Sequence, residues 1–286
     1  MARNTVGKSG VTPTKHFLLN SLLGQEAGTY AGGHLQRWCD NALWIDLTAG
    51  DGEPTRTGKK PENSCSAGIF TKHANHVAKH KKPLSVHLIE VNESTYDKLN
   101  VSLQNRWLKK FPDARDIVKT KNEDSSRICL NVSNSTACFL NNDPNSIDDW
   151  AFTPDLLESA PPFTRTLTTM GCNVGGLKRV LIKSPELSDK WRKNIEMLFA
   201  LQRHELILFA VGDASQWAYL ISTPDKWLEE TVKLCIKSHK FQTQAKREPR
   251  VITTKEPKKF DLLLDELLMT QKQLEEKNFI QTELGI

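Results

Sequence analysis

Short apolar runs alternate with longer amphipathic stretches between about residues 42 and 223. This alternation is typical of a parallel sheet covered by helices. The apolar runs predict five successive strands, over 42–47, 84–90, 116–120, 136–142 and 179–183. Apolar positions at helical spacing predict helices over 65–79, 94–111 and 187–201, the second of them capped by Asn92 or Ser94.

Two further apolar runs, 204–211 and 217–221, are separated only by Gly-Asp-Ala-Ser-Gln. That connection is too short for a crossover helix, so the two strands are expected to form an antiparallel hairpin. The pattern therefore predicts an α/β protein of Rossmann-like type, with a parallel sheet that ends in an antiparallel hairpin.

Basic residues are concentrated in two segments, although the formal net charge of the 286-residue chain is only +5. Segment 56–82 has seven Lys or Arg against the single acid Glu62, and segment 233–259 has nine against two acids. We expect one main domain over 1–232, followed by a basic C-terminal extension over 233–286 with an amphipathic helix from about 260 to 277. Such segments favour nucleic acid as a partner, DNA before RNA, with a solvated charge run or a protein partner as the alternatives.

Metal ligation, disulfides and membrane insertion find no support in the composition. The six cysteines include no C-x-x-C pair and no Cys/His cluster of metal spacing, so we expect buried free thiols and no metal. No apolar run approaches the length of a bilayer span, and the first residues lack the apolar region of a secretory signal. A cytoplasmic location is expected.

The first candidate site is the run Asp46-Leu-Thr-Ala-Gly-Asp-Gly52, directly after the first predicted strand. Its two glycines allow a sharp turn and a ligand lying against the backbone. The second predicted strand ends in Glu90, from which a carboxylate can accept both hydroxyls of a ribose in a doubly wound fold. The alternative for Glu90 is a charge that stabilises the following helix N-terminus.

Polar residues also follow the third and fourth predicted strands. Asn122 and Asp124 occupy a position where a short side chain meets the amino group of an adenine, although both residues also favour turns. Asn142-Asp-Pro-Asn145 follows the fourth strand, and strand ends at the centre of such a sheet are where ligands bind.

In this order the glycine run, the acid ending strand two and Asn-Asp-Pro-Asn resemble an amino-group methyltransferase. Lys15-His-Phe-Leu-Leu, Ser66-Ala-Gly and Gly171-Cys-Asn resemble the three-Cys-motif partner proteins, a methyltransferase-like family, over about residues 12–225. The resemblance implies S-adenosylmethionine as cofactor. The predicted cofactor-binding residues are Asp46, Thr48, Gly50, Asp51, Gly52, Glu90, Val91, Asn122 and Asp124. The predicted catalytic residues are Asn142, Asp143, Pro144 and Asn145.

Amino-methyltransferases place a carboxylate and a proline carbonyl around the target nitrogen, roles that the resemblance gives to Asp143 and Pro144. Two hydrogen bonds there would direct the nitrogen lone pair at the methyl carbon. The chain departs from the pattern at Asn145 and Ser146, where a second proline and an aromatic residue are usual, and Trp150 is the candidate stacking residue. Three functions remain open: methylation of adenine N6 in DNA, methylation of RNA or protein, and a catalytically silent cofactor-binding module.

Overall fold

The protein is built on an eight-stranded sheet with the order β3-β2-β1-β4-β5-β7-β6-β8. The computed structural model describes residues 12–34, 37–55, 60–143, 156, 158–170, 205–211, 217–223, 250–253, 258 and 276. The strands are β1 (Asn41–Asp46), β2 (Leu84–Ile89), β3 (Val118–Lys121), β4 (Thr136–Asn142), β5 (Phe163–Met170), β6 (Glu205–Val211), β7 (Trp217–Thr223) and β8 (Arg250–Thr253).

The sheet has the predicted mixture of strand directions. Strands β3, β2, β1, β4 and β5 are parallel to one another. Strand β7 is antiparallel to both β5 and β6. The antiparallel hairpin of β6 and β7 is therefore confirmed. The strand order reverses between β1 and β4, which makes the carboxyl ends of these two strands the topological switch point of the sheet.

The fifth parallel strand differs from the sequence expectation. It is β5, and the predicted strand 179–183 and helix 187–201 lie outside the described residues. Strand β5 reads Phe-Thr-Arg-Thr-Leu-Thr-Thr-Met, so a search for apolar runs passes over it. Threonine is β-branched and suits a strand, and the side chains from Thr164 to Thr169 are buried despite their polar atoms.

The described helices are α1 (Thr12–Ala31), α2 (Ser66–Lys79), α3 (Glu93–Ser102) and α4 (Leu108–Lys110), with a π turn η3 (Leu103–Trp107) between the last two. Short 3₁₀ turns are η2 (Pro61–Ser64), η4 (Pro112–Ala114) and η5 (Ser125–Arg127). The predicted helices 65–79 and 94–111 are confirmed, and the Asn92 side chain caps α3 by accepting from Thr95 N at 3.0 Å. Helix α1 is an addition to the sequence interpretation.

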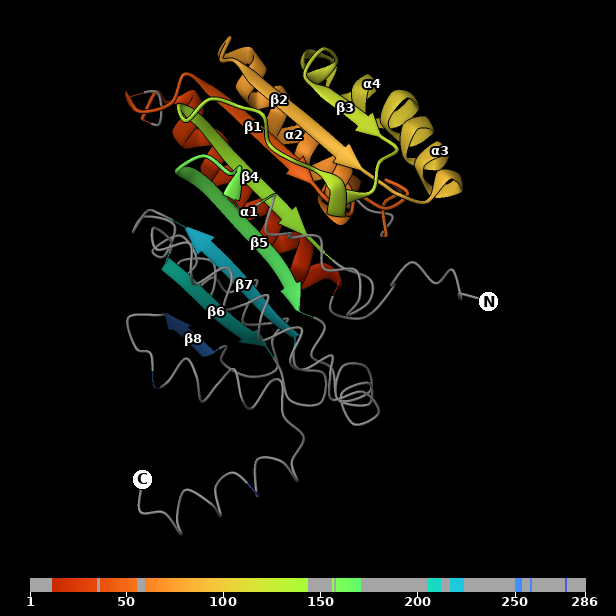
Figure 1. Ribbon diagram of the computed structural model, residues 1–286. Helices are drawn as coiled ribbons and strands as arrows, with labels where there is room; N and C mark the ends of the chain where they lie inside the picture. Colours follow the sequence, from red (N-terminus) through yellow and green to blue (C-terminus); the bar gives the residue numbers. More distant parts are fainter. Residues whose placement is uncertain are drawn as a thin grey trace.

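Helices α1 and α2 pack against each other and lie behind the sheet in the view of Figure 1. Alternate strand positions, such as Trp44 and Phe139, face these helices, and Phe70 of α2 meets Phe139 edge to face with 6.3 Å between the ring centroids. Leu18 and Leu22 of α1 are fully buried in the same core. This packing fixes α1 over β4 and β5, and so brings its first turns to the switch point.

The C-terminal extension contributes to the sheet. Strand β8 lies within the predicted basic segment 233–259 and pairs antiparallel with β6. The amphipathic helix expected over about 260–277 lies outside the described residues except for position 276.

Candidate functional site

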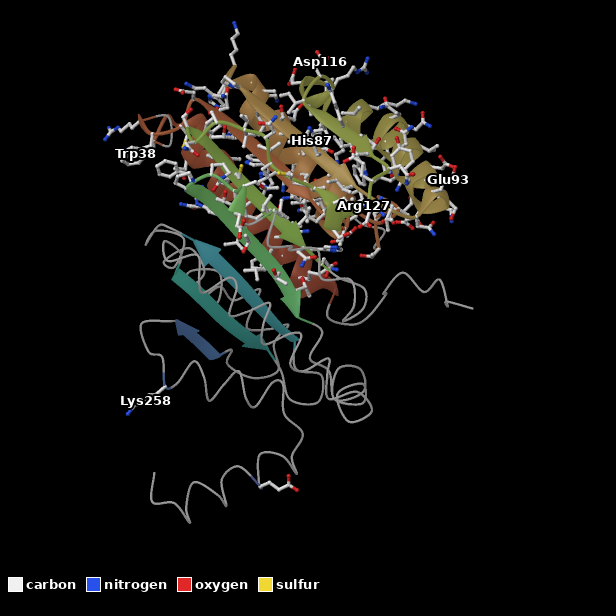
Figure 2. All side chains as sticks on the ribbon, in the orientation of Figure 1. Trp38, His87, Glu93, Asp116, Arg127 and Lys258 are labelled. Carbon is white, nitrogen blue, oxygen red and sulfur yellow. The ribbon has the colours of Figure 1, made fainter. Side chains whose placement is uncertain are left out.

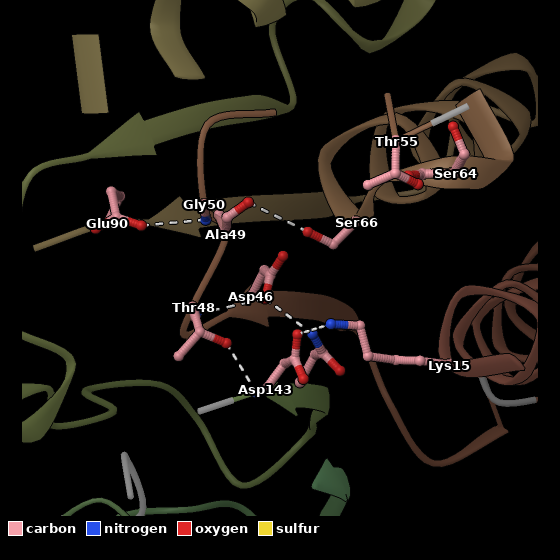
Figure 3. Close-up of polar contacts among 11 residues, drawn as sticks. Lys15, Asp46, Thr48, Ala49, Gly50, Thr55, Ser64, Ser66, Glu90 and Asp143 are labelled. Atoms are coloured by element: carbon pink, nitrogen blue, oxygen red, sulfur yellow. Dashed lines mark hydrogen bonds and ion pairs between the residues drawn. The ribbon is translucent and has the colours of Figure 1, made fainter. Parts of the chain in front are cut away.

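The ends of β1 and β4 are joined by a hydrogen bond at the switch point. Thr48 follows β1, and its hydroxyl oxygen accepts from Asp143 N, directly after β4, at 2.8 Å (Figure 3). Two residues predicted for separate cofactor and catalytic roles therefore lie side by side. Carboxyl ends of parallel strands at a switch point are the usual ligand position in open α/β sheets.

Lys15 reaches the same point from α1. Its ammonium group forms an ion pair with Oδ2 of Asp143, and both side chains are about one-fifth exposed, at 22% and 21%. In the sequence, Lys15 stands out only as part of the motif Lys15-His-Phe-Leu-Leu. The signal for its position is the helical spacing of apolar residues in α1, which predicts a helix and the face of it that meets the sheet. These residues are Leu18, Leu19, Leu22, Leu23 and Ala27.

Gly50 and Glu90 form the second half of the site. Gly50 N donates to Oε2 of Glu90 at 3.1 Å, and Asn92 N donates to Oε1 at 2.9 Å. Gly50 has φ +65°, and no heavy atom lies within 4 Å of the position that a Cβ would take. The backbone at Gly50 is therefore open to a ligand, beside a carboxylate held in place by two main-chain groups.

Gly52 differs from Gly50 in its surroundings. A Cβ there would lie 2.9 Å from Leu99 Cδ1, so this glycine faces helix α3 and makes room for protein packing. Its carbonyl oxygen accepts from Ser102 Oγ and Trp107 Nε1, each at 2.9 Å, and from Cys65 Sγ at 3.4 Å. Of the two glycines, Gly50 has open space at the Cβ position and Gly52 does not, and cofactor binding by either remains a prediction.

Asp46, the last residue of β1, holds the start of the loop that leads to Gly52. Its side chain is completely buried, and Oδ1 accepts from Asn141 Nδ2 at 2.9 Å and from Thr48 N at 3.4 Å. Loss of hydration on burial raises the pKa of Asp46 to about 6, against the lowering effect of its polar neighbours, among them Asn141. In this arrangement Asp46 acts on the site through Thr48 and Asn141.

Of the remaining predicted cofactor residues, Val91 is exposed beside Glu90, and the others form hydrogen bonds that hold nearby loops and strand ends. Asn122 Nδ2 donates to the carbonyls of Glu90 and Val91, at 2.9 and 3.3 Å, and so holds the end of β2. Val91 is 65% exposed beside Glu90 and presents an apolar surface. Asp124 caps η5 by accepting from Ser126, and these hydrogen bonds lower its pKa. Asp51 Oδ1 accepts from Glu53 N at 3.0 Å, within its own loop.

Asn142 is buried at the end of β4. Neither its Nδ2 nor its Oδ1 has a hydrogen-bond partner in the described part of the chain. A buried amide without partners costs free energy, so both atoms require an explanation. The other two predicted catalytic residues, Pro144 and Asn145, lie outside the described residues, as does Trp150.

The described residues of the basic segment, 60–82, do not form one surface. Lys72 Nζ donates to Asn20 and Asn63, and burial lowers its pKa to about 8, while burial of His73 against α1 lowers its pKa to about 3. The exposed residues 79–81 end α2 at the amino edge of the sheet. Figure 2 labels Trp38 on this edge and Glu93 on the opposite one, where the candidate site lies.

No group of three or more His, Cys, Asp or Glu side chains among the described residues could hold a metal ion. Cys39, Cys65 and Cys138 are buried free thiols, as expected, whereas Cys129 is exposed. Within the part of the chain that the structure describes, no helix has the length and apolar character needed to cross a bilayer.

No protein-family model and no curated protein matches the sequence. A solved structure from Legionella pneumophila is 7% identical, with a TM-score of 0.47 over 82% of this chain and 96% of the other. An rRNA methylase from Streptococcus thermophilus is 10% identical, with a TM-score of 0.38 over 68% and 93%. A precorrin-6y C5,15-methyltransferase from Geobacter metallireducens is 13% identical, with a TM-score of 0.38 over 78% and 92%.

The fold class is read from the sheet itself. The strand order, with β7 antiparallel between β5 and β6, is the Rossmann-like methyltransferase arrangement that the sequence predicts. The function is therefore inferred from the chemistry of the site.

Proposed function

We propose that this protein is a methyltransferase that uses S-adenosylmethionine. The observation that carries the proposal is the pairing of Gly50 with Glu90, because it places an open backbone next to a fixed carboxylate at the ends of β1 and β2. Each carboxylate oxygen has two acceptor positions, so Glu90 can bind the two ribose hydroxyls while keeping its main-chain contacts. Exposed Val91 provides an apolar surface for the adenine.

The acceptor side of the site is the end of β4. Asp143 is fixed there by Thr48 through its main chain and by Lys15 through its carboxylate. A carboxylate in this position accepts an N–H bond from a target amino group and aims the nitrogen lone pair at the methyl carbon. Pro144, by the resemblance, supplies the second acceptor through its carbonyl.

The reaction requires no metal and no covalent enzyme intermediate. The target nitrogen attacks the methyl carbon, the carbon–sulfur bond breaks, and its electron pair stays on sulfur, which gives S-adenosylhomocysteine. The methylated nitrogen then loses one proton to solvent. The protein contributes mainly by position, by exclusion of water and by the hydrogen bonds at Asp143.

The acceptor that we propose is an exocyclic amino group in DNA, adenine N6 first. The basic composition and the excess of Lys and Arg in segment 233–259 support a polyanionic substrate. RNA and protein are the alternative acceptors. A catalytically silent module is a second candidate function, because Lys15 already occupies one oxygen of Asp143.

The test is transfer of a radiolabelled methyl group from S-adenosylmethionine to unmethylated DNA, total RNA and a protein extract. We expect label in DNA as N6-methyladenine, lost in Asp143→Ala and retained in Asp97→Ala, which removes an exposed carboxylate of α3. Cofactor binding is measured separately by calorimetry, with Glu90→Gln expected to weaken it. Binding without transfer to any acceptor would favour the silent module, and absence of binding would reject the proposal.

A further inference from the structure

One face of the β4–β5 pair carries polar side chains close to the candidate site. The register pairs Asn142 with Thr168, and Leu140 with Thr166, so Asn142, Thr166 and Thr168 point to the same side of the sheet. Leu167 points to the other side, where it joins the core with α1. All three polar side chains are nine-tenths or more buried.

The polar atoms of these three side chains have no hydrogen-bond partner among the described residues. They are Nδ2 and Oδ1 of Asn142, Oγ1 of Thr166 and Oγ1 of Thr168. Each unpartnered polar group buried in a fold costs free energy, so a cluster of four such atoms is a substantial loss of stability. Such a loss is tolerated where the groups serve a ligand.

Other polar groups on the same strand are partnered in the usual way. Thr164 Oγ1 donates to the carbonyl of Pro161 at 2.7 Å, and Arg165 pairs with Glu26 of α1 at 2.8 Å. The unpartnered atoms on the face of Asn142 are instead gathered towards the carboxyl end of β5, beside Asp143. Thr169 also has an unpartnered hydroxyl, but it lies on the opposite face and so provides a control.

We propose that Asn142, Thr166 and Thr168 form the surface that recognises the methyl acceptor, and that this acceptor is an amino-substituted nitrogen heterocycle of a nucleic acid. The inference rests on the proposed methyltransferase function and extends it to the choice of substrate. Asp143 and Pro144 take the two N–H bonds of the target amino group, so the Asn142 amide is left for the ring, where its Nδ2 can donate to the nitrogen next to the amino-bearing carbon.

The two hydroxyls distinguish a base from a protein amide. Thr166 and Thr168 are two residues apart on one strand, a separation of about 6–7 Å, which is comparable to the width of a purine. Apart from its amino group, a glutamine or asparagine acceptor has only a carbonyl oxygen, which Asn142 would satisfy alone. A heterocycle with further ring nitrogens, or the sugar attached to it, supplies partners for the hydroxyls as well.

The experiment compares Thr166→Val and Thr168→Val with two matched controls, Thr164→Val and Thr169→Val. The probes are an unmethylated adenine-containing oligodeoxynucleotide, the same oligonucleotide with purine at the target, an RNA oligonucleotide and a protein extract. Cofactor affinity, melting temperature and the KM and kcat of methyl transfer are measured for every variant.

We expect Thr166→Val and Thr168→Val to raise the KM for the adenine oligonucleotide about tenfold each, with cofactor affinity unchanged and the melting temperature unchanged or higher. Thr164→Val should lower the melting temperature and leave the KM alone, and Thr169→Val should leave the KM alone. Asn142→Leu should abolish measurable transfer while cofactor binding persists.

Three outcomes would overturn the inference. In the first, adenine is methylated with the same KM in Thr166→Val and Thr168→Val as in the wild type. In the second, these variants unfold at lower temperature, as expected for a structural hydrogen bond. In the third, label enters protein and no nucleic acid. Failure of the proposed function itself is recognised separately, because the wild-type protein would then bind no cofactor or transfer no methyl group to any probe.

Discussion

Lys15 and Asp143 lie 128 positions apart in the sequence and form an ion pair where α1 passes the end of β4. The contact ties the first helix to the switch point of the sheet. Asp143 is also held by Thr48, so three separate segments of the chain determine the position of one carboxylate.

Loss of the Lys15 ammonium should impair transfer more than cofactor binding. We expect Lys15→Met to lower kcat about tenfold or more, because misplacement of Asp143 disturbs the alignment of the acceptor. Lys15→Arg should recover part of the rate. Steady-state kinetics and calorimetry check this expectation, with Lys98→Met, at an exposed lysine of α3, as the control. Equal kcat in Lys15→Met, Lys15→Arg and Lys98→Met would show that Lys15 has no role in methyl transfer.

The two glycines of the loop should respond differently to alanine. Gly50→Ala puts a methyl group into the open space that the proposed cofactor would occupy, so we expect weaker cofactor binding. The methyl group meets no protein atom, and the strain of alanine at φ +65° costs about 1 kcal/mol, so the loss of stability should be small. Gly52→Ala carries the same strain at φ +67° and also brings Cβ to 2.9 Å from Leu99 Cδ1, so it should lower the melting temperature more than Gly50→Ala does. Calorimetry and thermal unfolding separate the two effects, and an unchanged cofactor affinity in Gly50→Ala would contradict the proposed binding mode.

Asp46 should make the protein less stable as the pH rises. Its folded pKa of about 6 is above the ordinary 3.8, so the folded state binds this proton more tightly than the unfolded state. The stabilisation is complete below pH 3.8 and is lost as the pH rises through 6.

Asp46→Asn removes this titration and keeps an oxygen that can accept from Asn141 and Thr48. We expect the variant to equal the wild type near pH 3.5 and to be more stable at pH 8, by about 3 kcal/mol at most. Denaturant unfolding at both pH values provides the measurement. A difference that is constant with pH would show that Asp46 does not titrate in this range.

The buried ion pair of Glu26 and Arg165 should be sensitive to loss of one partner. Both side chains are almost completely inaccessible to solvent, with N and O atoms 2.8 Å apart. Arg165→Met leaves a carboxylate in the core and should cost about 3–5 kcal/mol of unfolding free energy. The double variant Glu26→Leu/Arg165→Met should recover most of this loss. Recovery is measured by denaturant unfolding, and equal destabilisation of single and double variants would argue against the pair.

Strands β1 and β4 were accessible from the sequence because both of their faces are buried and most of their side chains are apolar, and the bounds of β4 agree with the prediction at both ends. Strand β5 was not, because its threonines and Arg165 are polar, and only the surrounding sheet shows that they are buried. Burial of this kind depends on contacts that no local pattern contains.

The same reasoning applies to the site. The run from Asp46 to Gly52 and the acid Glu90 could be located from the sequence, since each follows an apolar strand directly. The sequence could not show that Gly50 has open space at its Cβ position and Gly52 has none, because this difference depends on where α3 packs. Lys15 could be quoted within a motif, but its contact with Asp143 follows from the position of α1 across the sheet.

The hydrogen bonds to the Gly52 carbonyl should affect the association rate and the binding entropy of the proposed cofactor. Because donors from α2 and α3, including Ser102 at a separation of 50 residues, immobilise this oxygen, the loop is already ordered before any ligand arrives. The entropy of ordering has been lost during folding, so association should involve little reorganisation of the backbone. Substitutions inside α3, out of reach of the ligand, would then change its residence time.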